Sequence, residues 1–238
     1  MRVTLALVAI CTAVYVGMVM TSAAPDDRLA FTQRHMIDWG GIYGAELRRG
    51  AWWRLLTAVF VHASPDHLVF NMLALVQLGH YLEPRYAAAR FLALYLVCGL
   101  TSSAVSAAWY WDRDIVQIGA SGAIMGLVGA GAVSAWRIGS RGRSFRNSMI
   151  VWGLVTLVNG VLYSANNVAH LAGIVSGALA VAVFGRRGRA ALAPREPGGP
   201  SLDDAVGPAC PRCGAANPPG SRFCGKCGVA LEAAAATP

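Results

Sequence analysis

The sequence is poor in charge and almost without lysine. Only 13% of its 238 residues are charged and Lys226 is the only lysine, whereas a soluble globular domain usually carries about 25% charged residues. So few charges argue against a water-soluble enzyme, and a hydrophobic content of 55% argues against a disordered chain. The 27 glycines follow no three-residue period, which excludes collagen. These absences leave a membrane protein as the class to consider.

Long apolar stretches dominate the chain as far as Phe184. A membrane-spanning helix needs roughly 20 mostly apolar residues. Six segments approach this length: 3–20, 66–82, 91–109, 118–136, 148–163 and 167–184. Lipid offers the backbone no hydrogen-bond partners, so each segment is expected to satisfy its own backbone groups as a helix. We therefore predict an all-α membrane protein with six transmembrane helices.

Arginine is distributed unevenly around these predicted helices. With six spans, one side of the membrane receives most of the arginines that flank a helix, and the other side is mixed in sign. The arginines on the first side are Arg2, Arg85, Arg90, Arg137, Arg141, Arg143, Arg146, Arg186, Arg187 and Arg189. Because cytoplasmic loops carry an excess of basic residues, we predict a multi-pass protein of the cell membrane with both termini in the cytoplasm. The lipid bilayer is then its first partner.

The first apolar segment has a second interpretation. Arg2, the apolar run and the small residues 22–24 also fit a signal peptide with its cleavage site. The apolar part of a signal peptide is about 7–15 residues long, and the run over residues 3–20 is longer. We therefore expect a retained helix, and the orientation of the other five helices is the same in either case.

Four polar residues lie near one end of the predicted helices. His67 and Asn71, four residues apart, share one face of the second helix. Ser121 lies near the start of the fourth helix and His170 near the start of the sixth. All three helices run inward in the predicted topology, so at 1.5 Å per residue these side chains fall within roughly 10 Å of the outer surface. Polar groups are costly in a membrane, and a set at one depth indicates a functional site.

Glycines predict which of these helices touch. The fourth helix has small residues at helical spacing, namely Gly119, Gly122, Gly126 and Gly129. In the sixth helix His170 is followed by Gly173 and Gly177 at similar spacing. Small residues in such a stripe let two helix backbones approach closely. We therefore expect Ser121 to lie within reach of His170.

A serine beside a histidine supplies the parts of a nucleophilic catalyst. The hydroxyl of Ser121 becomes a good nucleophile only when a base accepts its proton, and the imidazole of His170 is available as that base near neutral pH. The predicted fourth to sixth helices contain no Asp or Glu, so the pair would be a dyad without an acidic third member. Candidate donors to the oxyanion of acyl transfer are His67, Asn71 and the Ser121 backbone N–H.

Each of these residues also has a purely structural explanation. A serine in a membrane helix often donates to a carbonyl of its own helix, as is expected for Ser102, Ser103 and Ser106. A single buried histidine is more often a satisfied structural group than a catalyst. The joint pattern, and not any one residue, therefore carries the functional prediction.

Taken together, these motifs resemble the rhomboid family of intramembrane serine proteases. The matching residues are Trp53-Arg54 in the outer loop, then His62, His67 and Asn71, the segment Gly119-Ala120-Ser121-Gly122, and Ala169-His170 followed by Gly173 and Gly177. The resemblance covers about residues 1–185 and implies a six-helix rhomboid-like bundle. The turn Glu83-Pro84-Arg85-Tyr86 only loosely resembles the family's acidic turn at the end of the second helix.

The resemblance also implies roles for these residues. Ser121 would be the nucleophile and His170 the general base. His67 and Asn71 would form the oxyanion hole together with the Ser121 amide, and Trp53 would brace the outer loop together with Arg54. Catalysis would need no cofactor, and the substrates would be transmembrane proteins cut near the outer membrane surface.

Two other functions compete with this one. A catalytically inactive rhomboid-like scaffold that binds transmembrane helices would be favoured by loss of either dyad residue, and both Ser121 and His170 are present. A transporter or channel would more often carry charged residues at mid-membrane or paired broken helices. The sequence shows neither feature, so an intramembrane serine endopeptidase is the predicted function.

The C-terminal tail contains two Cys-x-x-Cys pairs, each followed by glycine: Cys210 with Cys213, and Cys224 with Cys227. Four thiolates at this spacing form a closed tetrahedral zinc site, and the segment resembles a small zinc ribbon. The predicted cytoplasmic location argues against disulfides, and iron in a rubredoxin-like site is the remaining alternative. So short a segment needs a metal to fold, so we predict a structural zinc ion.

Composition divides the chain into four parts. Residues 1–185 form the predicted membrane protease domain, and 186–209 a flexible linker rich in Arg, Pro, Gly and Ala. Residues 210–228 form the predicted zinc-ribbon-like domain, and 229–238 a disordered tail. The ribbon carries few basic residues, which argues against nucleic acid and favours a cytoplasmic protein as its partner.

Overall fold

The computed structural model describes residues 1–22, 30–162, 166–184, 209–215, 223–224 and 226–231. The chain divides into two compact units, Met1–Ala193 and Pro194–Pro238. The predicted linker 186–209 lies almost wholly outside the described residues, as does most of the predicted tail 229–238. Two of the small residues of the alternative cleavage site, 23–24, also lie outside them.

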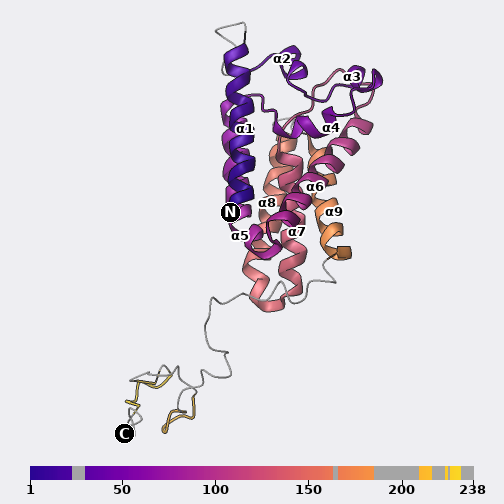
Figure 1. The fold of residues 1–238 in the computed structure, drawn as a ribbon. Coiled ribbons are helices and arrows are strands. Elements are labelled where there is room, and N and C mark those ends of the chain that lie inside the picture. Colours follow the sequence, from indigo (N-terminus) through magenta and orange to yellow (C-terminus); the bar gives the residue numbers. More distant parts are fainter. Residues whose placement is uncertain (23–29, 163–165, 185–208, 216–222, 225, 232–238) are drawn as a thin grey trace. The chain divides into compact units, whose positions relative to one another are not determined.

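Long helices make up the described part of the first unit. They are α1 (Arg2–Thr21), α5 (Pro65–Tyr86), α6 (Ala88–Trp109), α7 (Ser121–Arg137), α8 (Arg143–Leu162) and α9 (Asn167–Phe184). Figure 1 shows them as a bundle, with three short helices gathered at one end, namely α2 (Gln33–Asp38), α3 (Gly44–Arg48) and α4 (Arg54–Thr57). Two 3-10 turns, η2 (Ala58–Phe60) and η3 (Gly139–Gly142), complete the unit. Where the structure describes the chain it has no β-strand, only the isolated bridges Ile42–Gln117 and Phe223–Ala230, so the predicted all-α class is confirmed.

The six predicted spans are not all recovered by length and hydropathy. Among the described helices, α1, α6 and α8 are long and apolar enough to cross a membrane, and a fourth span is counted if the bent pair Arg54–Phe60 and Pro65–Tyr86 is one broken span. The apolar part of α9 is shorter, and α7 has 17 residues. Most of α7 is buried against other helices, so it faces protein more than lipid. The six-span topology therefore stays a prediction.

The glycine stripes of α7 and α9 face each other, as the sequence predicts. A Cβ added at Gly177 would lie 1.8 Å from the carbonyl oxygen of Gly126, and one at Gly173 would lie 2.2 Å from that of Gly122. The two helix backbones are therefore in direct contact, with no side chain between them. Because the contact continues toward the first turns of both helices, it sets the distance between the residues that those turns carry.

Glu83, near the end of α5, anchors the start of α1. Its buried carboxylate accepts hydrogen bonds from the backbone N–H groups of Val3 (3.0 Å) and Thr4 (2.9 Å), and from the Thr4 hydroxyl (2.6 Å). It thus supplies, from another helix, acceptors that the first-turn N–H groups lack. Two residues earlier, Tyr81 stacks on Phe145 of α8 with ring centroids 3.4 Å apart. The turn that only loosely resembles the family's acidic turn is therefore well packed.

Gly177→Ala tests the contact between α7 and α9. Its methyl group would meet the carbonyl oxygen of Gly126 at 1.8 Å, and because that neighbour is backbone, the helices must separate. We expect the free energy of unfolding to fall by about 1–3 kcal/mol, the usual cost of overpacking. Gly153→Ala in α8 is the matched control, since its methyl group would make only ordinary contacts from 3.7 Å. Thermal unfolding in detergent compares them, and equal midpoints would contradict the close contact.

Candidate active site

The segment before α7 holds Ser121 in place as the first residue of that helix. Gln117 forms an antiparallel bridge with Ile42, and the backbone N–H of Gly119 donates to the carbonyl of Ala58 (2.8 Å). Gly119 has a φ of +106°, and a Cβ there would lie 2.8 Å from a neighbouring imidazole nitrogen. Glycine suits both conditions, because it has no Cβ and tolerates positive φ. Ser121 therefore follows a tight turn that backbone hydrogen bonds tie to the outer loop.

The structure brings Ser121 and His170 together. Oγ of Ser121 lies 2.9 Å from Nε2 of His170, a hydrogen-bond distance between the first turns of α7 and α9. His170 is 5% exposed, and its Nδ1 is buried with no hydrogen-bond partner among the described residues. When Nε2 acts as the acceptor, Nδ1 carries the ring proton. Within the described residues, no side chain or carbonyl therefore bonds to Nδ1, and the orientation of the imidazole depends on its contact with Ser121 and on the packing of α9.

His67 and Asn71 lie on α5 and line the same cavity as the serine–histidine pair. Nδ1 of His67 lies 3.4 Å from the backbone N–H of Ala63 and accepts from it, so Nε2, close to Gly119, is the nitrogen with a proton to donate. The Asn71 amide donates to the His67 carbonyl (2.7 Å), which uses one of its two hydrogens. The Ser121 backbone N–H, at the start of a helix, has no carbonyl one turn earlier to donate to. Three donors thus border the cavity beside the hydroxyl.

The cavity itself has a volume of about 730 Å³. Its lining is mixed: polar groups surround the dyad, Ile124 and Met125 contribute apolar surface from α7, and Gln33, Arg113 and Thr156 add further polar groups. Phe70 of α5 and Trp152 of α8 also line it and are exposed on the surface of the bundle, so the cavity reaches that surface between α5 and α8. A hydroxyl, an imidazole and hydrogen-bond donors at one wall of such a cavity have the parts needed to hydrolyse a peptide or ester bond.

Three residues that the sequence pattern does not mark out lie beside the dyad. Asn166 precedes α9, and its Oδ1 accepts from the backbone N–H of Ala169 (3.1 Å). Its Nδ2 donates to Oγ of Ser106 in α6 (2.6 Å) and lies 3.5 Å from Oε1 of Gln117. Ser102 donates to a carbonyl of its own helix as expected, whereas the hydroxyl of Ser106 accepts from Asn166, which is distant in the chain. An asparagine just before an apolar helix is a sequence signal for a helix cap. No local sequence signal predicts the contacts of Asn166 with Ser106 and Gln117.

Arg54 connects the loop that carries α2 and α3 to the helical bundle. The residue is 7% exposed. Its guanidinium donates to the carbonyls of Ile37 and Gly41, the latter at 3.0 Å. It also lies over the ring of Trp53, 4.6 Å from its centroid, and 3.8 Å from the carboxylate of Glu46. Ile42, the residue after Gly41, forms the bridge to Gln117 in the segment before α7. Arg54 thus holds the loop that supports the start of that helix.

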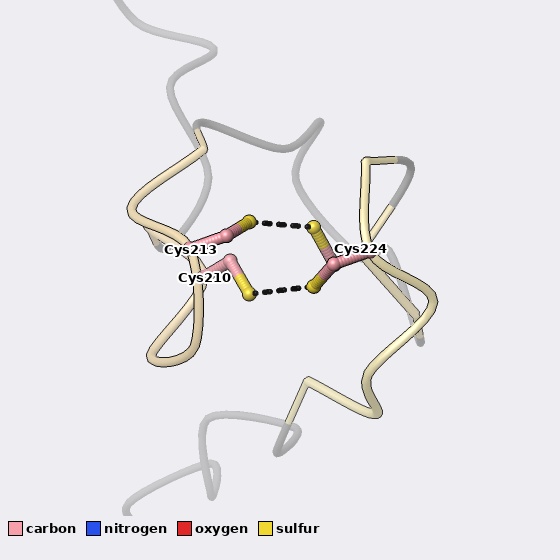
Figure 2. Close-up of side chains that lie close together, drawn as sticks. Cys210, Cys213 and Cys224 are labelled. Carbon is pink, nitrogen blue, oxygen red and sulfur yellow. Dashed lines mark hydrogen bonds between the residues drawn. The ribbon is translucent and has the colours of Figure 1, made fainter.

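The second unit brings the four predicted zinc ligands together, with their sulfur atoms all within 4.8 Å of one another. They are Cys210, Cys213, Cys224 and Cys227. Figure 2 shows the first pair facing the second, with S···S contacts of 3.6 and 3.7 Å. A glycine with positive φ follows each pair, at +68° and +71°, and its N–H donates to the carbonyl of the first cysteine of that pair. Each pair is therefore presented by a tight turn.

The chemistry of this cluster fits a metal site. All four cysteines are free thiols. The backbone N–H groups of Cys227 and Lys226 lower the pKa of the Cys224 thiol to about 6, which favours its thiolate. The pKa values of Cys213 and Cys227 are raised, because burial and the neighbouring sulfurs disfavour further negative charge. Four sulfur donors with no fifth ligand nearby among the described residues match the closed tetrahedral geometry of structural zinc.

Comparison with known proteins gives a consistent result. Residues 49–187 match the family model of the Rhomboid domain, and residues 210–230 match that of a zinc-ribbon domain. The chain is 31% identical over 201 residues to rhomboid protease AarA of Providencia stuartii, covering 74% of this chain and 70% of that protein. It is 34% identical to rhomboid protease GluP of Bacillus subtilis, covering 63% of this chain and 29% of the relative. For RHOMBOID-like protein 1 of Arabidopsis thaliana the identity is 34%, over 56% of this chain and 34% of the relative.

Arg54→Ala tests the anchoring of the outer loop. Loss of the guanidinium removes the donor to the Gly41 carbonyl and leaves the Ile37 carbonyl with the Gly40 N–H alone. We expect a loss of about 1.5–3 kcal/mol in unfolding free energy, the range for hydrogen bonds to charged groups. Arg54→Lys should not restore it, because the ammonium lacks the planar fork. Arg34→Ala is the control, since its ion pair with Asp38 is exposed. Thermal unfolding measures the effect; similar midpoints for Arg54→Ala and Arg34→Ala would refute the anchor.

Proposed function

The chain belongs to the rhomboid family, and we propose on this basis that it is an intramembrane serine endopeptidase that cleaves transmembrane proteins near the outer membrane surface. The observation that carries the proposal is the 2.9 Å contact between Oγ of Ser121 and Nε2 of His170, made at the wall of a cavity that reaches the surface of a membrane bundle. The proposal includes six spans with both termini in the cytoplasm, and a membrane domain that covers residues 1–185.

In the proposed reaction, Ser121 attacks the carbonyl carbon of the substrate as Nε2 of His170 accepts the hydroxyl proton. The oxyanion that forms is stabilised by preorganised donors from His67, Asn71 and the Ser121 amide. As the C–N bond breaks, His170 gives the proton to the leaving amine and an acyl-enzyme remains. A water molecule then attacks the acyl carbon, losing a proton to His170. The bond between that carbon and Oγ breaks, His170 returns the proton to Oγ, and the second product leaves as a carboxylic acid.

The substrate enters, in this proposal, between α5 and α8. Phe70 and Trp152 line the cavity there and are exposed on the bundle surface, so an apolar segment reaches the site from the lipid without crossing the polar end of the bundle. Peptide bonds inside a helix are shielded by its own hydrogen bonds. The substrate must therefore unwind locally at the dyad, where polar donors and water replace the lost helical bonds.

The alternative function is an inactive rhomboid-like scaffold that binds transmembrane helices. It uses the same cavity but needs neither a proton acceptor near Ser121 nor oxyanion donors. The hydrogen bond between Ser121 and His170 favours the protease. Substitution of either residue separates the two functions, because binding would survive it and cleavage would not.

Ser121→Ala and His170→Ala test the dyad. Each should lower cleavage of a model transmembrane substrate by about 10⁴-fold or more, as loss of a catalytic serine or histidine does in other serine proteases. Purified full-length protein in detergent is assayed on gels, with thermal unfolding as the test of folding. Ser148→Ala, an exposed serine of α8 bonded to its own helix, is the matched control and should stay fully active. Undiminished cleavage by both dyad variants would end the assignment.

For the tail, we propose that the four cysteines bind one structural zinc ion. When bound, zinc supplies the folding energy that so small a unit cannot draw from a hydrophobic core. The described core of this unit consists of Cys210, Cys224 and Leu231 with a few partly buried neighbours. The role of the unit, in this proposal, is to dock a cytoplasmic protein and not to take part in hydrolysis.

Metal analysis tests the zinc site. Full-length protein purified without added metal should contain one zinc ion per chain, and Cys213→Ser or Cys227→Ser should lose most of it, because three thiolates hold zinc far more weakly than four. Cys98→Ala, a buried thiol of α6, should keep the full content. Deletion of 205–238 should leave basal proteolysis intact. A coloured protein that contains iron would instead favour the rubredoxin-like alternative.

A further inference from the structure

In the part of the chain that the structure describes, the proposed base has no partner at Nδ1 that would orient it. Nδ1 of His170 is buried and makes no hydrogen bond within the described residues. The described helices α7, α8 and α9 contain no acidic residue, so no carboxylate takes the place that Asp occupies in a serine-protease triad. Apart from its contact with Ser121, the imidazole is therefore positioned by the first turn of α9. Whatever sets the start of α9 also sets the geometry of the proposed dyad.

Asn166 sets that start in two ways. As the residue before α9, it accepts from the backbone N–H of Ala169 through Oδ1 (3.1 Å), and its carbonyl accepts from the N–H of His170 (3.1 Å). This is the arrangement of a helix N-cap. Its Nδ2 donates to Oγ of Ser106, which is 1% exposed at the end of α6. The first turn of α9 is thus both capped and tied to a neighbouring helix.

The same amide also reaches the segment that carries the nucleophile. Nδ2 of Asn166 lies 3.5 Å from Oε1 of Gln117, and Gln117 is 7% exposed and joined to the outer loop by its backbone. Gln117 lies four residues before Ser121, and Asn166 lies four residues before His170. The two segments therefore meet twice, once at the dyad and once four residues earlier in each.

We propose that Asn166 is the positioning residue of the dyad: its amide joins α9, α6 and the segment before Ser121, and so holds the His170 imidazole against the hydroxyl. The inference rests on the proposed protease function. Asn166 touches neither the hydroxyl nor the imidazole, so it acts through the placement of α9. Because an error of about 1 Å in placement can cost about 100-fold in rate, loss of the amide should slow the chemistry of Ser121 more than it weakens substrate binding.

The test measures how fast a fluorophosphonate probe labels Ser121 in the purified full-length protein. The probe is small and needs an activated serine, so its rate reports the dyad independently of a protein substrate. We expect labelling of Asn166→Ala to be about 10- to 100-fold slower than that of the unmodified protein. In cleavage of a model transmembrane substrate, kcat should fall by a similar factor with KM nearly unchanged.

Two further substitutions separate the helix-capping bond of Asn166 from its bond to Ser106 in α6. Asn166→Asp keeps an acceptor for the Ala169 N–H, and its carboxylate can accept from the Ser106 hydroxyl, so labelling should return to within about threefold of the unmodified protein, as expected when a cap is kept. Asn166→Ser keeps a good cap but is too short to reach α6, and it should stay about 10-fold slow. If Asn166→Ala does not fold, the comparison of Asn166→Asp with Asn166→Ser takes its place as the test. Equal labelling rates for Asn166→Ser and the unmodified protein would overturn the proposal.

Asn167→Ala is the matched control for a merely structural role. Its amide donates to the carbonyl of Leu157 in α8 (2.9 Å). The variant therefore loses a hydrogen bond from the start of α9 to a neighbouring helix, as Asn166→Ala does. It should lower the unfolding midpoint about as much as Asn166→Ala while labelling at a normal rate. If Asn166→Ala and Asn167→Ala lose labelling equally, Asn166 contributes only to stability and the proposal is wrong. Failure of the unmodified protein to be labelled, or labelling that survives Ser121→Ala, would instead refute the proposed function.

Discussion

The direct contact between the backbones of α7 and α9 is the constraint on which the rest of the site depends. With glycine at Gly126 and Gly177, the two helices approach until carbonyl oxygens of one meet Cα atoms of the other. Only at that separation do the first turns bring a serine and a histidine to 2.9 Å. Hydrogen bonds of this kind usually have donor–acceptor distances of about 2.5–3.2 Å, so a methyl group that pushed the helices apart would lengthen the contact between Ser121 and His170 as well as loosen the core.

A second constraint acts at the end of the bundle that carries the short helices α2, α3 and α4 (Figure 1). Irregular backbone there must satisfy its polar groups without help from lipid. Arg54 and the bridge between Ile42 and Gln117 do so, and the turn at Gly119 extends the same network to the start of α7. The support of the outer loop and the placement of the serine are therefore one arrangement, since a buried polar network is stable only when all its members are satisfied.

The two units illustrate how much can be predicted from sequence. The cysteine ligands are recognisable because their chemistry is local, with each pair set by one turn and a following glycine. The dyad residues were recognisable because small residues at helical spacing show which helix faces can touch. The sequence did not reveal the contacts that Ser106 and Gln117 make with Asn166, or the donors to Glu83. A buried polar side chain does not indicate its partner when that partner lies tens of residues away in the chain. The six-span count also exceeds what the hydropathy of the described helices supports, because buried helices such as α7 need not resemble lipid-facing ones.

The sequence alone therefore determined the helical class, the stripes of glycine, the candidate serine and histidine, and the four-cysteine cluster. All of these follow from residue type and short-range spacing. Tertiary structure alone decided that Nδ1 of the imidazole has no partner among the described residues, that Asn166 links three segments, and that Glu83 anchors the start of α1. Those facts depend on distances between residues far apart in the chain, which arise only when the helices pack.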